Sequence, residues 1–257
     1  MKTVAIIAAG GIGSRLGVAG GKQLLSVCGK PLTAWALQAA CDARVTDAVV
    51  VACDPRRVAL YEEQLRAAIT ADKPLYFVAG GSSRTASIAA ALERVDDDAE
   101  TILIQDGARP LVSPGLIDAA CEALRRAGPE VAGVIVGHPV SDTLKAAAPS
   151  LPQNAAATTP PSAAGLARIA ATVSREGLWQ VQTPQVFRAA ALRDAYRRAQ
   201  EHGQAATDDA GILEDAGYQL ALLTGPRDNI KVTVAEDLEI VHALLSLRER
   251  DEEMVRS

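Results

Sequence analysis

The chain has 257 residues, of which 49% are apolar and only 3% aromatic, and its formal net charge is −5 at pH 7. That length allows one large domain or two small ones, with a core built from small aliphatic side chains. The acidic balance argues against a nucleic-acid-binding protein, which would show a basic stripe. An anionic substrate must therefore be held by local cations rather than by the field of the whole protein.

Cysteine and histidine lack the spacing of a metal site. The four cysteines form no CxxC pair and the three histidines are scattered (Cys28, Cys41, Cys53, Cys121; His138, His202, His242). The apolar run after Lys2 stops at Gly10, which is too short for a signal peptide. No apolar stretch reaches the roughly 18 residues needed to span a membrane. We therefore expect a soluble cytoplasmic protein with reduced cysteines and no membrane partner.

Short apolar runs alternate with amphipathic stretches through the first half of the chain. The predicted strands are 3–8, 48–52, 75–78, 101–104 and 131–136, and the predicted helices between them are 31–43, 55–69, 84–95 and 114–127. The runs are apolar throughout rather than alternating, which is typical of strands buried on both faces of a parallel sheet. The pattern predicts a single α/β domain, Rossmann-like and doubly wound, with a mostly parallel sheet.

This pattern breaks after Val136. The stretch 146–170 is rich in alanine and proline, carries almost no charge and has no apolar period. It predicts a flexible insert rather than a second domain, because it cannot bury a core. Helices are predicted again at 188–201, 208–215 and 235–246, and the charged tail 248–257 is expected to fray.

A glycine-rich loop, AAGGIGSRLGVAGGKQ (8–23), follows the first predicted strand. Ligands of open α/β sheets bind beyond the carboxyl ends of the strands, so this loop is the first candidate site. Leu16 and Gln23 break the P-loop pattern GxxxxGK[ST], and Leu16 also breaks the dinucleotide pattern GxGxxG. The spacing A-G-G-x-G-x-R-(x6)-K favours a loop whose backbone amides and two cations, Arg15 and Lys22, bind a nucleoside triphosphate. A tight turn with two solvated cations is the alternative.

Six further motifs follow in order: GGSSRTASI (80–88), QDGARP (105–110), PVSDTLK (139–145), REGLWQVQTPQVF (175–187), TDDA (207–210) and DNIKVT (228–233). With the glycine loop they make the chain resemble the 2-C-methyl-D-erythritol 4-phosphate cytidylyltransferases of the non-mevalonate isoprenoid pathway, from Val4 to Leu245. The ribitol-5-phosphate cytidylyltransferases share much of this framework, and the AGG of the loop is more like theirs. Ser87, DTLK and DNIKVT favour the isoprenoid enzymes.

The resemblance implies a nucleotidyltransferase domain over 1–257, with an arm at 139–175 that embraces the second subunit of a homodimer and supplies substrate contacts across it. The implied nucleotide-binding residues are Ala9, Gly10, Gly11, Gly13, Gly80, Gly81, Ser82 and Ser87. The implied catalytic cations are Arg15, Lys22 and Lys231. Contacts to the sugar phosphate would come from Asp106, Arg109, Thr143, Arg175, Thr183 and Thr207.

The implied reaction joins CTP to a sugar-alcohol phosphate and releases pyrophosphate. Its nucleophile is a phosphate monoester with a second pKa of about 6, so no general base is needed. Catalysis would come from in-line positioning and from cations at the α-phosphorus. We expect Mg²⁺ to be held mainly by the CTP phosphates, because the sequence shows no protein cage for it.

Two alternatives to this interpretation stay open. One is an enzyme that acts on ribitol 5-phosphate or another polyol phosphate. The other is a catalytically silent nucleotide-binding regulator, against which the presence of Arg15, Lys22 and Lys231 together argues.

Overall fold

The computed structural model describes residues 2–11, 21–148, 167–202 and 208–256. The chain divides into two compact units. One, the body, comprises Met1–Gly137 with Val181–Ser257, and the other, the inserted unit, is His138–Gln180. No helix among the described residues is long and apolar enough to cross a membrane.

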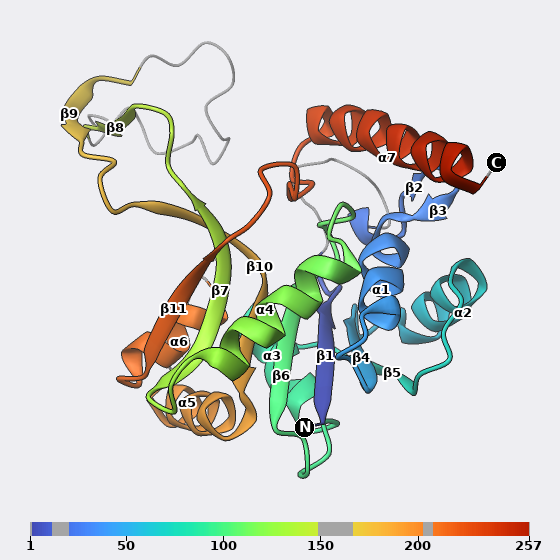
Figure 1. Ribbon diagram of the computed structural model, residues 1–257. Helices are drawn as coiled ribbons and strands as arrows, with labels where there is room; N and C mark the ends of the chain where they lie inside the picture. Colours follow the sequence, from blue (N-terminus) through green and yellow to red (C-terminus); the bar gives the residue numbers. More distant parts are fainter. Residues whose placement is uncertain (1, 12–20, 149–166, 203–207, 257) are drawn as a thin grey trace. The chain divides into compact units, whose positions relative to one another are not determined.

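A sheet, seven-stranded over the described residues, has the strand order β11-β7-β10-β6-β1-β4-β5 (Figure 1). Pairing is parallel between β1 and both β4 and β6, between β4 and β5, and between β7 and β11, whereas β10 runs antiparallel to β6. The mostly parallel sheet predicted from the sequence is therefore confirmed. Its strands are β1 (Thr3–Ala8), β4 (Ala48–Cys53), β5 (Leu75–Ala79), β6 (Thr101–Asp106), β7 (Val131–Pro139), β10 (Trp179–Arg188) and β11 (Gln219–Thr224).

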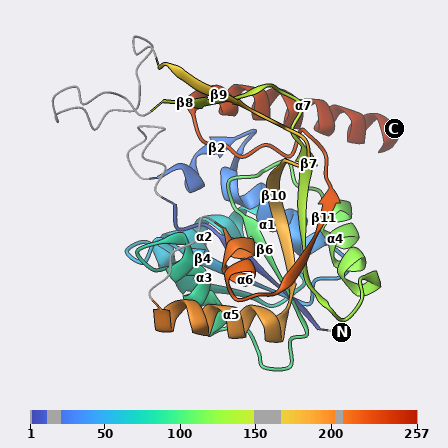
Figure 2. The same ribbon diagram turned by 90° about the vertical axis from the view of Figure 1, so that its left-hand side faces the viewer.

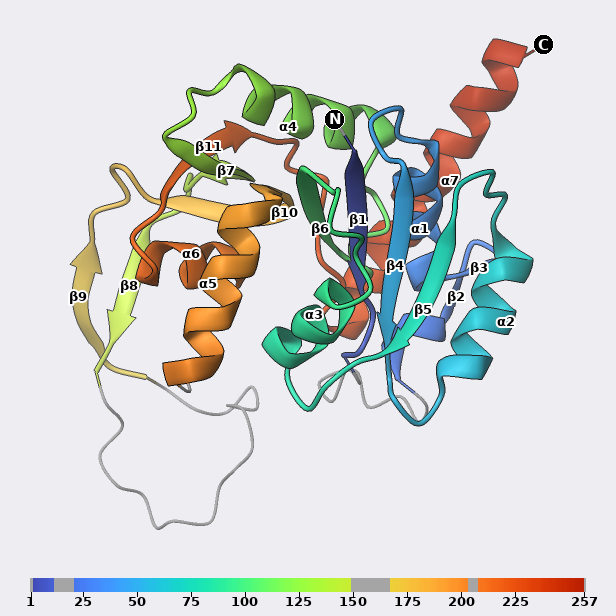
Figure 3. The same ribbon diagram turned by 90° about the horizontal axis from the view of Figure 1, so that it is seen from below.

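Helices cover both faces of this sheet, as Figure 3 shows, and Figure 2 looks from the side on which α5 and α6 lie. Side chains of β1 alternate between two cores: Ala5 and Ile7 belong to one, Val4 and Ile6 to the other. Burial on both faces is the reason for the unbroken apolar runs. The first core includes α1 (Leu32–Asp42), α2 (Val58–Ala68) and α4 (Pro114–Arg126), and the second α3 (Arg84–Leu92), α5 (Ala189–His202) and α6 (Asp209–Asp215).

The C-terminal helix α7 (Ala235–Arg256) closes a third, smaller core. There Val241 and Leu245 pack with Val27, which belongs to the hairpin of β2 (Ser26–Val27) and β3 (Lys30–Pro31). The expectation of a frayed tail from 248 is wrong, because the helix continues to Arg256. The tail is composed largely of arginine, glutamate and methionine, which are strong helix formers.

The inserted unit contains an antiparallel pair, β8 (Leu144–Ala147) and β9 (Ile169–Val173). The prediction of a flexible insert over 146–170 is thus wrong at its two ends, where Ala146 and Ala147 pair with Ala171 and Ile169. The β-branched residues of β9 favour a strand there. Residues 149–166 of the predicted insert lie outside the described residues.

Candidate active site

A cavity of about 380 Å³ lies in the body at the carboxyl ends of β1 and β6. This is where ligands bind in open α/β sheets, and the volume falls in the usual range for small-molecule sites. Its lining comes from segments far apart in the sequence: Ala8, Gly10, Gly11, Lys22, Gln23, Gly81, Ser82, Ser83, Arg84, Ser87, Asp106, Ala108, Lys231 and Thr233. The fold therefore brings the glycine loop together with three of the later motifs.

Many of the residues predicted from the sequence line this cavity: Gly10, Gly11, Lys22, Gly81, Ser82, Ser87, Asp106 and Lys231. Ala9 and Gly80 stand next to it and are tied to β4, since their backbone N–H groups donate to the carbonyls of Ala52 and Cys53. Arg109 and Thr183 are buried residues that contact Asp106.

The other predicted residues are not placed in the cavity. Thr143 and Arg175 are exposed and belong to the inserted unit. The Arg175 guanidinium donates there to the carbonyl of Ser141. Gly13, Arg15 and Thr207 lie outside the described residues.

One group of residues, the glycine wall, comprises the lining residues Gly10, Gly11, Gly81 and Ser87 together with the neighbouring Gly80. The Ser87 Oγ accepts from the Gly81 N–H at 3.1 Å and donates to the carbonyl of Ser83 at 2.8 Å. A Cβ atom on Gly80 would lie 2.8 Å from both the Cys53 carbonyl oxygen and the Ser87 Oγ, and one on Gly10 3.2 Å from that Oγ. Glycine is needed at these positions because the chain passes so close to Cys53 at the end of β4 and to Ser87 on α3. The wall therefore offers a ligand mainly backbone groups.

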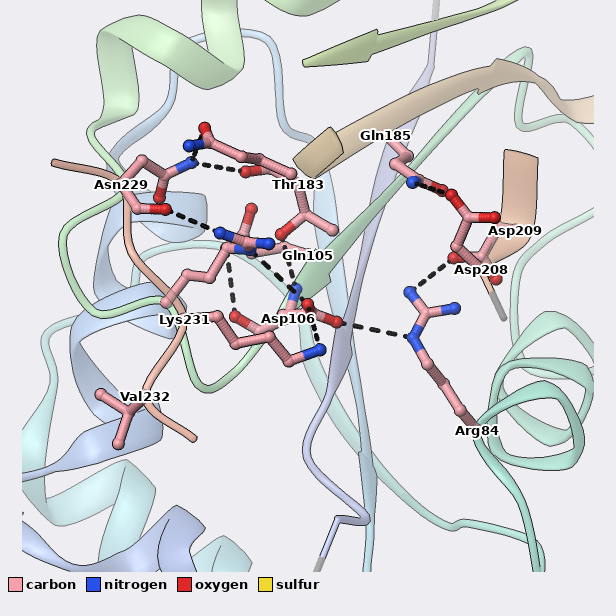
Figure 4. A network of polar contacts seen from close by, with 12 residues as sticks. Arg84, Gln105, Asp106, Thr183, Gln185, Asp208, Asp209, Asn229, Lys231 and Val232 are labelled. Atoms are coloured by element: carbon pink, nitrogen blue, oxygen red, sulfur yellow. Dashed lines mark hydrogen bonds and ion pairs between the residues drawn. The ribbon is translucent and has the colours of Figure 1, made fainter. Parts of the chain in front are cut away.

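A second group of lining residues, the charged wall, comprises Lys22, Arg84, Asp106 and Lys231. Asp106 ends β6, and Figure 4 shows Lys231 and Arg84 reaching its carboxylate. Lys231 Nζ lies 2.8 Å from its Oδ2, Arg84 Nε 3.5 Å from its Oδ1, and Arg109 Nε 3.6 Å from its Oδ2. Burial alone would raise the pKa of Asp106, but Lys231, Arg84 and Arg109 outweigh it and lower this pKa to about 2. The carboxylate is therefore ionised at neutral pH, and the cations around it outnumber it.

Arg84 is a cavity residue that the sequence reasoning missed. Its Nη2 lies 2.6 Å from Oδ2 of Asp209, a wholly buried carboxylate whose Oδ1 accepts from the Tyr196 hydroxyl at 2.5 Å. Burial alone would lower the pKa of Arg84, but Asp209 and Asp106 outweigh it and raise that pKa. Both Arg84 and Asp209 belong to motifs noted in the sequence, GGSSRTASI and TDDA, but nothing in their spacing indicated that they meet.

The two lysines of the charged wall meet the same short segment, residues 228–233. Lys231 belongs to it, and Lys22 Nζ donates to its Val232 carbonyl at 2.7 Å. Lys22 begins the short 3-10 helix η2 (Lys22–Leu24) and is only 8% exposed. Its ammonium group is thus held at the edge of the cavity rather than extended into solvent.

Comparisons with known proteins decide the family. The family model described as IspD, 2-C-methyl-D-erythritol 4-phosphate cytidylyltransferase, matches residues 3–247. The chain belongs to this cytidylyltransferase family. The resemblance predicted from the sequence motifs is thereby confirmed.

Relatives of the same family name cover almost the whole chain. The 2-C-methyl-D-erythritol 4-phosphate cytidylyltransferase of Synechococcus sp. (strain WH7803) is 36% identical over 95% of this chain and 99% of its own length. That of Thermosynechococcus vestitus is 33% identical over 96% of this chain and 97% of its own length.

Solved structures of the family agree with the fold. The cytidylyltransferase of Thermus thermophilus superposes with a TM-score of 0.69 at 32% identity, covering 95% of this chain and 98% of that one. The 4-diphosphocytidyl-2C-methyl-D-erythritol synthase of Anaerococcus prevotii gives a TM-score of 0.75 at 23% identity, covering 95% of this chain and 98% of that one. The latter likeness concerns the fold alone.

Proposed function

We propose that this chain transfers the cytidylyl group of CTP to 2-C-methyl-D-erythritol 4-phosphate. The products are 4-diphosphocytidyl-2-C-methyl-D-erythritol and pyrophosphate, as part of isoprenoid biosynthesis. The observation that carries this function is a cavity, in a chain of the cytidylyltransferase family, that is lined both by glycine backbone and by cations around Asp106. Such a cluster suits a reaction that must bring a phosphate anion against a polyphosphate.

CTP binds along the glycine wall in this proposal. Gly80, Gly81, Ser82 and Ser87 hold the cytidine, and the loop that follows β1 holds the triphosphate. Gly81, Ser82 and Ser87 all line the cavity, and this supports the assignment because a ligand can come close to the backbone of a glycine-rich segment. The nucleotide set of the proposal is completed by Ala9, Gly10, Gly11 and Gly13, with Arg15 and Lys22 on the phosphates.

The sugar phosphate binds at the charged wall, with Asp106 accepting hydrogen bonds from its hydroxyl groups. An oxygen of its phosphate attacks the α-phosphorus of CTP in line, a new O–P bond forms, and the bond to the pyrophosphate oxygen breaks. Lys22 and Lys231 neutralise charge as it moves from the attacking to the leaving oxygen. Arg109 and Thr183 hold Asp106 in place, and Thr207 completes the substrate set of the proposal.

Mg²⁺ is part of the proposed reaction. Among the residues that the structure describes, no group of three or more His, Cys, Asp or Glu side chains could hold a metal ion. The lining contributes one carboxylate, Asp106. This donor set fits an ion held mainly by phosphate oxygens and water, which is usual for Mg²⁺. When bound, the ion neutralises charge on the CTP phosphates.

A homodimer joined through the arm at 139–175 completes the proposal, with Thr143 and Arg175 serving the site of the other subunit. The exposed apolar side chains of β9 support an interface, since Ile169 is 65% and Val173 40% exposed. The four cysteines are free thiols, in keeping with the reducing cytoplasm as the compartment of the reaction.

Pyrophosphate release from CTP tests the function directly. Each assay contains the protein, Mg²⁺ and one phosphate, either 2-C-methyl-D-erythritol 4-phosphate or ribitol 5-phosphate. We expect turnover with the first and at most a trace with the second. Preference for ribitol 5-phosphate would establish the alternative substrate, and no release with either would favour the silent regulator.

Mixed dimers test whether the arm crosses between subunits. Lys22→Ala and Arg175→Ala homodimers should each be nearly inactive. In a heterodimer with crossed arms, one site carries both changes and the other carries neither. Random pairing gives roughly half heterodimers, so about a quarter of the wild-type activity should return on co-refolding. A mixture with proven heterodimers that stays as inactive as its parents would contradict the shared site.

A further inference from the structure

Asn229 is a wholly buried polar residue in the segment 228–233, which forms neither helix nor strand. The transfer mechanism uses Lys231 of this segment but assigns nothing to Asn229. A buried amide costs free energy unless its groups find partners, so its hydrogen bonds bear on why it is there.

The carboxamide of Asn229 ties the segment to β10 (Figure 4). Its Nδ2 donates to the carbonyl of Thr183 at 2.8 Å and to Oε1 of Gln182 at 3.0 Å. The backbone carbonyl of Asn229 accepts from Nη1 of Arg109 at 2.7 Å. One residue thus connects the segment both to β10 and to a cation of the Asp106 cluster.

A second attachment lies just beyond Lys231. The Val232 N–H donates to the carbonyl of Ala108 at 2.8 Å, and the Val232 carbonyl accepts from Lys22. Lys231 therefore sits between two attached residues, and its Nζ reaches Asp106 at 2.8 Å. Because the segment has no helical or strand hydrogen bonds of its own, these side attachments fix where Lys231 stands.

We propose that Asn229 is a positioning residue for the transfer reaction, acting through Lys231. Its carboxamide holds the start of the segment against β10 so that the Lys231 ammonium group stays beside Asp106. An apolar side chain of similar size could fill the same volume, but without hydrogen bonds to β10 it could not fix the position of the backbone of residues 228–233. This inference rests on the proposed function, in which Lys231 contacts the reacting phosphates.

The first test compares Asn229→Ala with a variant that weakens the fold elsewhere. Leu65→Ala serves as the control, because Leu65 is buried on α2 and does not line the cavity. Assays run well below the Tm of both proteins. We expect Asn229→Ala to lower kcat/KM for the sugar phosphate by about 10²-fold, a loss that a displacement of about 1 Å of a catalytic group can cause. Leu65→Ala should lower the Tm and leave kcat/KM unchanged. An Asn229→Ala enzyme as active as the control would overturn the proposal.

The second test asks whether the effect passes through Lys231. With Lys231→Ala already present, adding Asn229→Ala should change kcat/KM little, because the group that Asn229 positions is gone. The fall in Tm caused by Asn229→Ala should remain in that background. If Asn229→Ala lowered kcat/KM by the same factor in the Lys231→Ala background as in the wild type, Asn229 would not act through Lys231, and the proposal would be wrong.

The third test needs no turnover. In a crystal structure of Asn229→Ala, we expect residues 228–231 to be displaced and Lys231 Nζ to lie beyond ion-pair distance of Asp106. If the wild type itself fails to release pyrophosphate, the proposed function is wrong, and this structure still decides the positioning role. Should Asn229→Ala not fold, Gln182→Ala removes one acceptor of the same carboxamide and should give a smaller loss and displacement of the same kind. An unmoved segment in the variant that folds would overturn the proposal.

Discussion

The two walls of the cavity are built in opposite ways. The glycine wall is held by hydrogen bonds from a loop to a neighbouring helix and strand: the Gly81 N–H donates to Ser87 of α3, and the Gly80 N–H donates to Cys53 of β4. In the charged wall, Lys231 and Arg84 come from distant parts of the chain to pair with Asp106. This difference teaches what each wall can do. A surface of backbone groups determines which ligand shapes fit and how close the ligand can come. A cluster of cations held in place stabilises the negative charge that moves during the reaction.

Removing a cation from the charged wall should have the largest effect. We expect Lys22→Ala to lower kcat by about 10²–10³-fold with little change in CTP affinity, because its contact strengthens as charge develops. Turnover assays and calorimetric CTP titrations measure the two quantities. Lys2→Ala is the matched control, since its exposed pairs with Asp96 and Asp98 lie outside the cavity. Near-normal turnover of Lys22→Ala would contradict a catalytic role for Lys22, and with it the different functions assigned to the two walls.

Acid should reduce the free energy of unfolding that Asp106 contributes, over a pH range set by its folded and unfolded pKa values. The folded-state pKa of Asp106 is about 2, against an ordinary 3.8. The resulting stabilisation of about 2 kcal/mol is complete above about pH 5 and is lost progressively as the pH falls through the folded-state pKa of about 2. Denaturant unfolding between pH 2 and 6 measures it. Asp106→Asn should show a correspondingly flatter decline, and equal declines for the two proteins would contradict the assignment of this stabilisation to Asp106.

Base selectivity sharpens the account of the glycine wall. Cytosine presents an amine donor where uracil presents an oxygen acceptor, and carbonyls near Gly80 would be left facing that oxygen. A buried unpaired acceptor costs about 1–3 kcal/mol, so CTP should exceed UTP in kcat/KM by roughly ten- to a hundredfold. Steady-state kinetics with the two nucleotides check this. Equal values would mean that the glycine wall does not read the base.

A methyl group on the glycine wall should weaken CTP binding more than it slows the chemical step. In Gly80→Ala the new Cβ would lie 2.8 Å from the Cys53 carbonyl oxygen, so the loop must shift at a cost of at least about 1 kcal/mol. We expect KM for CTP to rise by about tenfold with kcat nearly constant. Gly115→Ala is the control, since its nearest neighbour would be 4.0 Å away. If Gly80→Ala lowered kcat and left KM for CTP unchanged, the glycine wall would act in the chemical step rather than in CTP binding, and the difference between the walls would be wrong.

The elements that could be predicted from the sequence are those buried on both faces. The run 3–8 reads as a strand because each of its residues is apolar or β-branched, and β1 spans Thr3–Ala8. β10 could not be predicted, because WQVQTPQVFR mixes glutamines with apolar residues and contains Pro184. Its glutamines form hydrogen bonds to specific residues elsewhere in the fold: Gln182 accepts from Asn229, and Gln185 donates to Asp208. Such pairings over long sequence distances leave no periodic signal.

Contacts between residues far apart in the sequence also limited what could be predicted of the site. Lys22 and the glycines could be recognised because one loop carries them at a fixed spacing next to a strand. Arg84 looks like any arginine in the first turn of a helix, and its importance comes from Asp209 and Asp106, which reach it only through tertiary packing. The motifs placed Asp106 in the site, but the number of cations around it follows from the folded chain.

The antiparallel direction of β10 decides where the inserted unit joins the body. Because β10 runs against β6, the chain returns from the inserted unit at Val181, close to Thr183, whose Oγ accepts the Asp106 N–H at 3.0 Å. On the outgoing side, the Gly225 N–H donates to the carbonyl of Gly137. Both junctions are thus fastened inside the body. A change of length within the inserted unit therefore need not alter the register of β10 beside Asp106.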